Sequence, residues 1–384
     1  MLICGGLLFH GAASARSDFS VNGALSLTGV EDDNLFSTPG TGTRDRISRL
    51  TPRFGADYRS ARLSLAGRYS LDAERYAEHP ELDTSRARQH GAIDLSARLS
   101  RRVGLALHGD YQTTLTPGGD FNLATGLAAG RMRARRLEVR PSIDWRSSPS
   151  AGGSVTFTQT MDDLAGGAAT GTRTAALELE RRTSPRNTAS LRLGATRYDF
   201  DAPGDTTARV LIVGWERDLG RGAALELRGG PRFSEGRTDP ELSASVRGDF
   251  KKTHVALAGG RSLATVIGRA GAVVTDSLQP SVAFSPRPSF QLSASPGYFR
   301  IRDARGNGPA ATVYLADLQA TWHLGDRLSL VGGYRRSRQR GSLDAPAPMM
   351  GATVTPFAHD TFLLSLVARQ GGGWTRSGGA PPVE

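Results

Sequence analysis

The chain has 384 residues, a formal net charge of +11 at pH 7 and a hydrophobic fraction of 38%. No stretch approaches the roughly eighteen consecutive apolar residues of a membrane helix, which excludes a helical membrane protein. Cys4 is the only cysteine, so cysteine-based zinc sites and a disulfide framework are excluded as well. A low apolar content remains compatible with a transmembrane β-barrel, because alternation halves the apolar content of each spanning strand.

The first fifteen residues have the pattern of a secretory signal peptide. A short apolar run from Leu2 to Phe9 is followed by Ala13-Ser14-Ala15, an A-x-A cleavage site, although no basic residues precede the run. We therefore expect residues 1–15 to be removed on export, which leaves a mature chain without thiols.

Strand patterns begin directly after this segment. Residues Phe19 to Thr28 alternate apolar and polar side chains, which is the period-two signature of a strand. A long connection from Val30 to about Arg46 leads to a hairpin that turns at Arg59-Ser60. The stretch from Gly91 to Gln112 shows the same unit most clearly, with two alternating runs joined by a turn at Ser100-Arg101-Arg102. So short a turn requires antiparallel pairing.

The unit recurs until the final expected strand, Thr361 to Arg369. We count about eighteen strands (16–18) of about ten residues each, a length that crosses a bilayer when tilted. Nine long and eight short connections alternate in this count, whereas a soluble β-sandwich shows no such alternation. The sequence predicts an all-β fold, a single antiparallel barrel over residues 16–369 in the bacterial outer membrane, with short periplasmic turns and long external loops. Residues 370–384 are expected to form a disordered tail.

One motif suggests a family. Residues Gly29 to Pro39 read GVEDDNLFSTP after the first strand, and Leu50-Thr51-Pro52 stand on the next strand. This pattern resembles the outer-membrane β-barrel porin families associated with exopolysaccharide gene clusters. The resemblance implies an outer-membrane location and a part in the export of a secreted polysaccharide, and it supplies no catalytic residues.

The polar face of each strand would line the lumen. The arginines expected there are Arg49, Arg53, Arg62, Arg68, Arg98, Arg136, Arg140, Arg192, Arg228, Arg247 and Arg335. The acidic residues expected there are Asp57, Asp94, Asp110, Glu138, Glu178, Glu180, Glu226, Asp249 and Asp317. Two interpretations stay open: these charges set the selectivity of a pore, or they pair across strands and only hold the barrel together.

Further basic residues gather in the short turns. They include Arg101, Arg102, Arg181, Arg182, Arg217, Lys251, Lys252 and Arg287. Such a ring at the periplasmic mouth would attract an anionic polysaccharide by long-range electrostatics, or it consists of ordinary solvated turn residues. The partners expected for such a barrel are outer-membrane lipid and lipopolysaccharide, the barrel assembly machinery and periplasmic export components.

Other functions find less support. The basic residues are scattered over turns instead of one element, which argues against nucleic-acid binding. The pairs His108 and Asp110, and His359 and Asp360, are the candidates for acid–base chemistry, but isolated pairs of this kind usually line pores or loops. The acidic segments Glu31–Asp33 and 72–83 could take divalent cations or be solvated, and no cofactor motif or metal motif is present. A channel is therefore expected, with a plugged structural or assembly barrel and an outer-membrane enzyme as alternatives.

Overall fold

The computed structural model describes residues 18–40, 42–115, 124–127, 131–200, 204–305, 310–341, 343 and 356–370. The expected signal peptide (residues 1–15) lies outside these described residues. Of the expected tail, residues 370–384, Gln370 belongs to the last strand and residues 371–384 lie outside the described residues.

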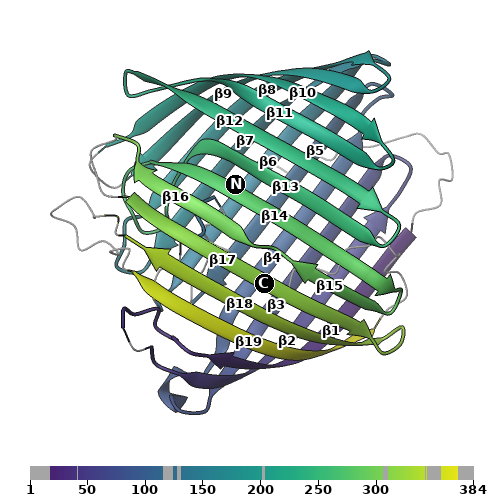
Figure 1. Ribbon diagram of the computed structural model, residues 1–384. Coiled ribbons are helices and arrows are strands. Elements are labelled where there is room, and N and C mark those ends of the chain that lie inside the picture. Colours follow the sequence, from purple (N-terminus) through teal and green to yellow (C-terminus); the bar gives the residue numbers. More distant parts are fainter. Residues whose placement is uncertain are drawn as a thin grey trace, which may run out of the picture.

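Strands make up nearly all of the described chain (Figure 1). They are β1 (Asp18–Asp32), β2 (Asp45–Arg59), β3 (Leu63–Tyr76), β4 (Thr84–Arg98), β5 (Val103–Thr114), β6 (Ala134–Ser148), β7 (Ala151–Leu164), β8 (Thr170–Ser184), β9 (Asn187–Phe200), β10 (Thr206–Gly220), β11 (Ala223–Ser234), β12 (Arg237–Phe250), β13 (Thr253–Ala264), β14 (Val273–Arg287), β15 (Phe290–Ala294), β16 (Gly297–Asp303), β17 (Ala310–His323), β18 (Leu328–Arg340) and β19 (Phe357–Gln370). A short 3-10 helix, η1 (Pro80–Leu82), lies between β3 and β4.

The strands pair antiparallel in chain order, and β1 pairs with both β2 and β19. The sheet therefore closes on itself and leaves no free edge. At the closing seam the Thr28 hydroxyl donates a hydrogen bond to the Ser365 hydroxyl at 2.8 Å.

The elements β15 and β16 are two parts of one strand. Both pair with β14, and the register is the same on either side of the interruption, with Ala294 opposite Val282 and Tyr298 opposite Leu278. Pro296 stands between the two parts and has no N–H to donate to the sheet. The barrel thus has eighteen strands, which confirms the predicted fold class and strand number.

The strands are longer than the sequence predicted. Apart from β15 and β16 they contain 12–15 residues instead of about ten. At about 3.4 Å per residue and a tilt of about 40°, a 14-residue strand rises about 36 Å, whereas the apolar band of such a barrel is about 25 Å tall. Strands therefore continue beyond the lipid, where their outward side chains become polar and the alternation of hydrophobicity fades.

The connections alternate between a short-turn end and a long-loop end, with one exception. The prediction of nine long connections is wrong at β11–β12, where only Glu235 and Gly236 lie between the strands. Both residues have positive φ angles, 49° and 74°, as in the type I′ turn that suits a tight hairpin.

The outward face of the barrel carries exposed apolar side chains. Phe54 and Val213 are each 62% exposed, and similar leucines follow on the other strands. Aromatic residues such as Tyr111 and Trp322 are also exposed on this face, as expected for side chains that contact the membrane interface. No helix in the described ranges is long and apolar enough to cross a membrane.

Candidate functional site

The interior of the barrel contains most of the predicted lumen residues. Strand alternation places them on the face opposite the exposed apolar side chains, as for Arg49 beside the outward Leu50. The arginines so placed are Arg49, Arg53, Arg68, Arg98, Arg136, Arg140, Arg192, Arg228, Arg247 and Arg335. Arg62 is a correction: β2 ends at Arg59 and β3 begins at Leu63, so Arg62 is an exposed residue of the turn.

Several of these inward arginines are paired with carboxylates. Arg49 contacts Glu74 at 2.8 Å, and Arg228 contacts Glu178 at 3.0 Å. The remaining pairs join Arg136 to Asp162 (2.6 Å), Arg140 to Glu138 (3.4 Å), Arg247 to Glu216 (2.9 Å) and Arg335 to Asp317 (2.9 Å). For these arginines the geometry favours a structural role, because each charge is neutralised by a neighbour on the barrel wall.

Another set of inward arginines lacks such partners. Among the described residues, Arg53, Arg68 and Arg98 have no carboxylate oxygen within 4.0 Å of their guanidinium nitrogens. They lie on the adjacent strands β2, β3 and β4, and Arg68 is opposite Gly55, two residues from Arg53. These three residues, the basic sector, share the inner face of β2–β4 with Asp57 and Asp94, and neither carboxylate lies within 4.0 Å of them. Arg192 on β9 also lacks a carboxylate partner among the described residues.

Exposure of the inner face differs between the two ends of the barrel. In the half near the short turns, inward side chains such as Arg68, Ser243 and Ser281 are exposed to solvent. Near the long loops, inward side chains are buried, and Ile301 and Val313 have no accessible surface. The lumen is therefore open to water from the short-turn end and narrowed at the long-loop end.

The loop between β5 and β6 causes part of this narrowing. Leu127 is 1% exposed and belongs to a buried cluster with Phe299, Ile301 and Val313, on the inner faces of β16 and β17. Gly126 has a φ of +63°, and a Cβ there would lie 2.8 Å from the Phe299 ring. In the strand order β16 and β17 lie roughly half the ring away from β5 and β6, so Gly126 and Leu127 lie against the wall opposite the strands that their loop joins.

The loop between β13 and β14 also folds inward. Ile267 packs with Ala134 and Leu164 of β6 and β7, and Gly268 forms an isolated β-bridge with Ala168 after β7. The buried Arg269 contacts Asp303 at 2.7 Å. Polar and apolar contacts together hold this second loop across the barrel mouth.

The GVEDDNLFSTP motif anchors a third loop, between β1 and β2. Leu35 is buried with Val30, Ile47 and Tyr76 of the first three strands. The Asn34 amide donates hydrogen bonds to the carbonyl oxygens of Thr38 (3.0 Å) and Ala358 (2.9 Å). The motif therefore fixes an external loop to the closing seam of the barrel.

Among the described residues, Asp32, Asp33 and His359 bring possible metal-ligating atoms within 4.8 Å of one another. His359 Nε2 already lies 2.8 Å from Asp32 Oδ1, so this contact explains the arrangement as part of the same loop attachment.

The candidate acid–base pairs are not assembled as catalytic relays. His108 contacts Asp94 at 2.7 Å and not Asp110, which contacts His90 at 2.6 Å. His359 faces both Asp32 and the Thr361 hydroxyl with the same nitrogen, Nε2. A nucleophile relay needs the two ring nitrogens to face different partners, so this geometry does not support acid–base catalysis by the pairs considered.

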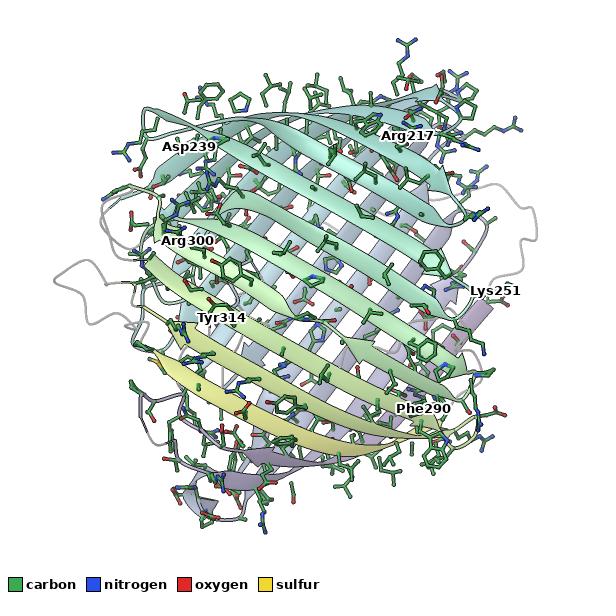
Figure 2. All side chains as sticks on the ribbon, viewed as in Figure 1. Arg217, Asp239, Lys251, Phe290, Arg300 and Tyr314 are labelled. Carbon is green, nitrogen blue, oxygen red and sulfur yellow. The ribbon has the colours of Figure 1, made fainter. Side chains whose placement is uncertain are left out.

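All eight members of the predicted mouth ring lie at the short-turn end and are exposed, and Figure 2 shows Arg217 and Lys251 at this end. Arg101, Arg102, Lys251 and Lys252 occupy turns, as predicted. Arg181, Arg182, Arg217 and Arg287 belong instead to strand ends, because the strands extend beyond the apolar band. Alternation turns Arg181 and Arg217 outward and Arg182 toward the mouth.

Comparison with known proteins agrees with this architecture. No protein-family model matches the sequence, and no curated protein matches it significantly. The structure is similar to that of OpdO from Pseudomonas aeruginosa, with a TM-score of 0.50, 14% sequence identity and coverage of 93% of this chain and 98% of OpdO. It is also similar to OccAB4 from Acinetobacter baumannii, with a TM-score of 0.50, 8% identity and coverage of 92% and 98%. The closed eighteen-stranded sheet with an exposed apolar face thus has the fold of an outer-membrane β-barrel porin.

Proposed function

We propose that this protein is a passive channel for small polar solutes across the bacterial outer membrane, with a preference for anions. The observation that carries the proposal is the water-exposed inner face near the short turns, where Arg53, Arg68 and Arg98 have no carboxylate partner among the described residues. Charged groups along an aqueous lumen set the selectivity of a pore. The inward loops would limit the size of the solutes that pass.

The basic mouth ring supports the same preference. It would concentrate anions at the periplasmic entrance through long-range attraction, which weakens as salt increases. Export of an acidic polysaccharide stays a hypothesis that rests on the resemblance of the β1–β2 loop motif. The positive charge of the periplasmic mouth ring is the one structural feature that supports this hypothesis.

Uptake into proteoliposomes tests the proposal. Labelled glucose and glucuronate are nearly equal in size and differ by one carboxylate, so the ratio of their entry rates reports charge preference. We expect both to enter, and glucuronate to enter faster when an added ionophore dissipates the membrane potential. Folded protein that admits neither sugar would contradict the channel and favour a plugged structural barrel.

A matched variant separates charge preference from pore opening. Replacing the basic sector by glutamine (Arg53→Gln, Arg68→Gln, Arg98→Gln) keeps side-chain polarity and removes three charges. Glucuronate entry should fall toward the rate of glucose, while the glucose rate stays close to that of the wild type. An unchanged ratio would remove the basic sector from the selectivity mechanism.

A further inference from the structure

A group of arginines lies on the outer surface of the barrel at the long-loop end. Arg300 of β16 and Arg338 and Arg340 of β18 are exposed and lie on the lipid-facing side of their strands. Figure 2 shows Arg300 and Tyr314 near this end. Within the described ranges, none of the three arginines has a carboxylate oxygen within 4.0 Å. We refer to these three residues as the outer arginine patch.

The strand register brings the members of this patch together. Thr312 of β17 is opposite both Arg300 and Arg340, so the two arginines stand two strands apart. At about 4.8 Å per strand, their backbones are about 10 Å apart. Arg338 is opposite Tyr314. It lies two residues before Arg340 on β18 and is therefore closer to the centre of the membrane. Flexible guanidinium groups at this spacing can contact one multivalent anion.

Other arginines near the patch contact carboxylates, whereas the three arginines of the patch do not within the described residues. Asp276 stands opposite Arg300 in the register of β14 and β16, but its carboxylate contacts Arg261 and Arg302 instead, at 2.5 and 2.8 Å. Arg336 lies 3.8 Å from Asp360. The free positive charge of this sector is therefore concentrated at the three residues of the outer arginine patch.

Two tyrosines, Tyr298 and Tyr314, lie next to the patch on the side nearer the centre of the membrane. The rings of Tyr298 and Tyr314 are 5.5 Å apart, centroid to centroid. The Arg340 guanidinium carbon lies 5.9 Å from the centre of the Tyr314 ring, within the range of a cation–π contact. Tyrosines at this depth mark the boundary between the apolar band and the headgroup region.

A groove of about 430 Å³ lies farther along the same strands, in the half of the barrel nearer the short turns. Ala294, Ala320 and Gly332 lie along its floor, where outward side chains are small, and larger side chains flank them, including Phe284 and Leu318. Tyr334 also lines the groove, and the arginines of β18 follow it along the strand. Basic groups, tyrosines and an apolar groove thus succeed one another on β14–β18.

We propose that this surface binds a lipopolysaccharide molecule of the outer leaflet, with its phosphates at the outer arginine patch and its acyl chains along the apolar strand faces between the tyrosines and the groove. Guanidinium groups bind phosphate through charge-assisted, often bidentate hydrogen bonds. The long strand ends raise the arginines above the apolar band, to the level where a phosphorylated headgroup lies. The proposal rests on the outer-membrane fold and is independent of whether the lumen conducts.

Binding of purified diphosphoryl lipid A to the folded full-length protein in detergent tests the proposal, with native mass spectrometry as the readout. The test variant is Arg300→Gln/Arg338→Gln/Arg340→Gln. The control variant is Arg135→Gln/Arg173→Gln/Arg209→Gln, which removes three exposed outward arginines at the same end of β6, β8 and β10. In the control, Arg135 and Arg173 already face Asp163 and Asp199, at 3.3 and 3.7 Å.

We expect one lipid A to bind wild type and control with similar affinity. The test variant should bind on the order of 100-fold more weakly, since each basic residue near an anionic surface contributes a factor of about five. Dephosphorylated lipid A and phosphatidylglycerol should bind wild type more weakly than diphosphoryl lipid A. If diphosphoryl lipid A binds the test and control variants with equal affinity, the proposed site is wrong. If phosphatidylglycerol binds the wild type as tightly as diphosphoryl lipid A does, the assignment of the site to lipopolysaccharide is wrong. Heat-dependent gel mobility establishes that every variant is folded.

Discussion

Replacing Leu127 by aspartate should release the β5–β6 loop from the inner wall and enlarge the pore. Leu127 is 1% exposed among Phe299, Ile301 and Val313, and full burial of a leucine contributes about 1.5–3 kcal/mol. A carboxylate among these apolar side chains adds a desolvation cost. A loss of about 3 kcal/mol changes the ratio of attached to released loop by more than a hundredfold.

Single-channel recording measures this release directly. The Leu127→Asp variant should show larger conductance steps than the wild type, and Leu127→Ala should lie between them because it loses packing but gains no charge. Leu227→Ala, on the lipid-facing side of β11 and 42% exposed, is the matched control and should leave the steps unchanged. Equal steps from wild type and a folded Leu127→Asp variant would refute the idea that this loop narrows the lumen.

Three further predictions follow from other parts of the barrel. In a KCl gradient, the triple glutamine variant of the basic sector should shift the reversal potential toward cation preference, and an unchanged potential would contradict a role in selectivity. Lys251→Glu with Lys252→Glu should weaken block by dextran sulfate added from the short-turn side, most strongly at low salt; equal block would contradict attraction by the mouth ring. Asp45 is 1% exposed and accepts hydrogen bonds from the N–H groups of Ala77 and Glu78, so Asp45→Ala should destabilise the β3–β4 loop by about 2–4 kcal/mol. Limited proteolysis of whole cells measures that change, and an unchanged cleavage rate in this loop would contradict it.

Much of the fold was predictable because the alternation of side chains within each strand shows which residues face outward and which face inward. Period-two alternation along runs such as Gly91 to Gln112 identifies spanning strands without reference to the rest of the chain. The same pattern missed the outer ends of the strands. There, outward residues such as Arg338 and Arg340 are polar because they lie beyond the apolar band, so the difference in hydrophobicity between the two strand faces disappears.

The site was only partly predictable, because its geometry depends on contacts between distant segments. The inward orientation of Arg49 and Arg53 follows from alternation alone. Within the part of the chain that the structure describes, Arg49 has a carboxylate partner and Arg53 has none, and this difference depends on the register of β2 against β3. The inward fold of the β5–β6 loop depends on Leu127 meeting Phe299, and no local pattern around residue 127 signals that contact.

We propose that the barrel encloses a water-filled path that its inward loops narrow without closing it. Single-channel conductance of the refolded wild-type protein in a planar bilayer tests it most directly. We predict discrete conductance steps with a reversal potential that indicates anion preference in a KCl gradient. Absence of any steps, from protein that heat-dependent gel mobility shows to be folded, would contradict the account and identify the barrel as plugged.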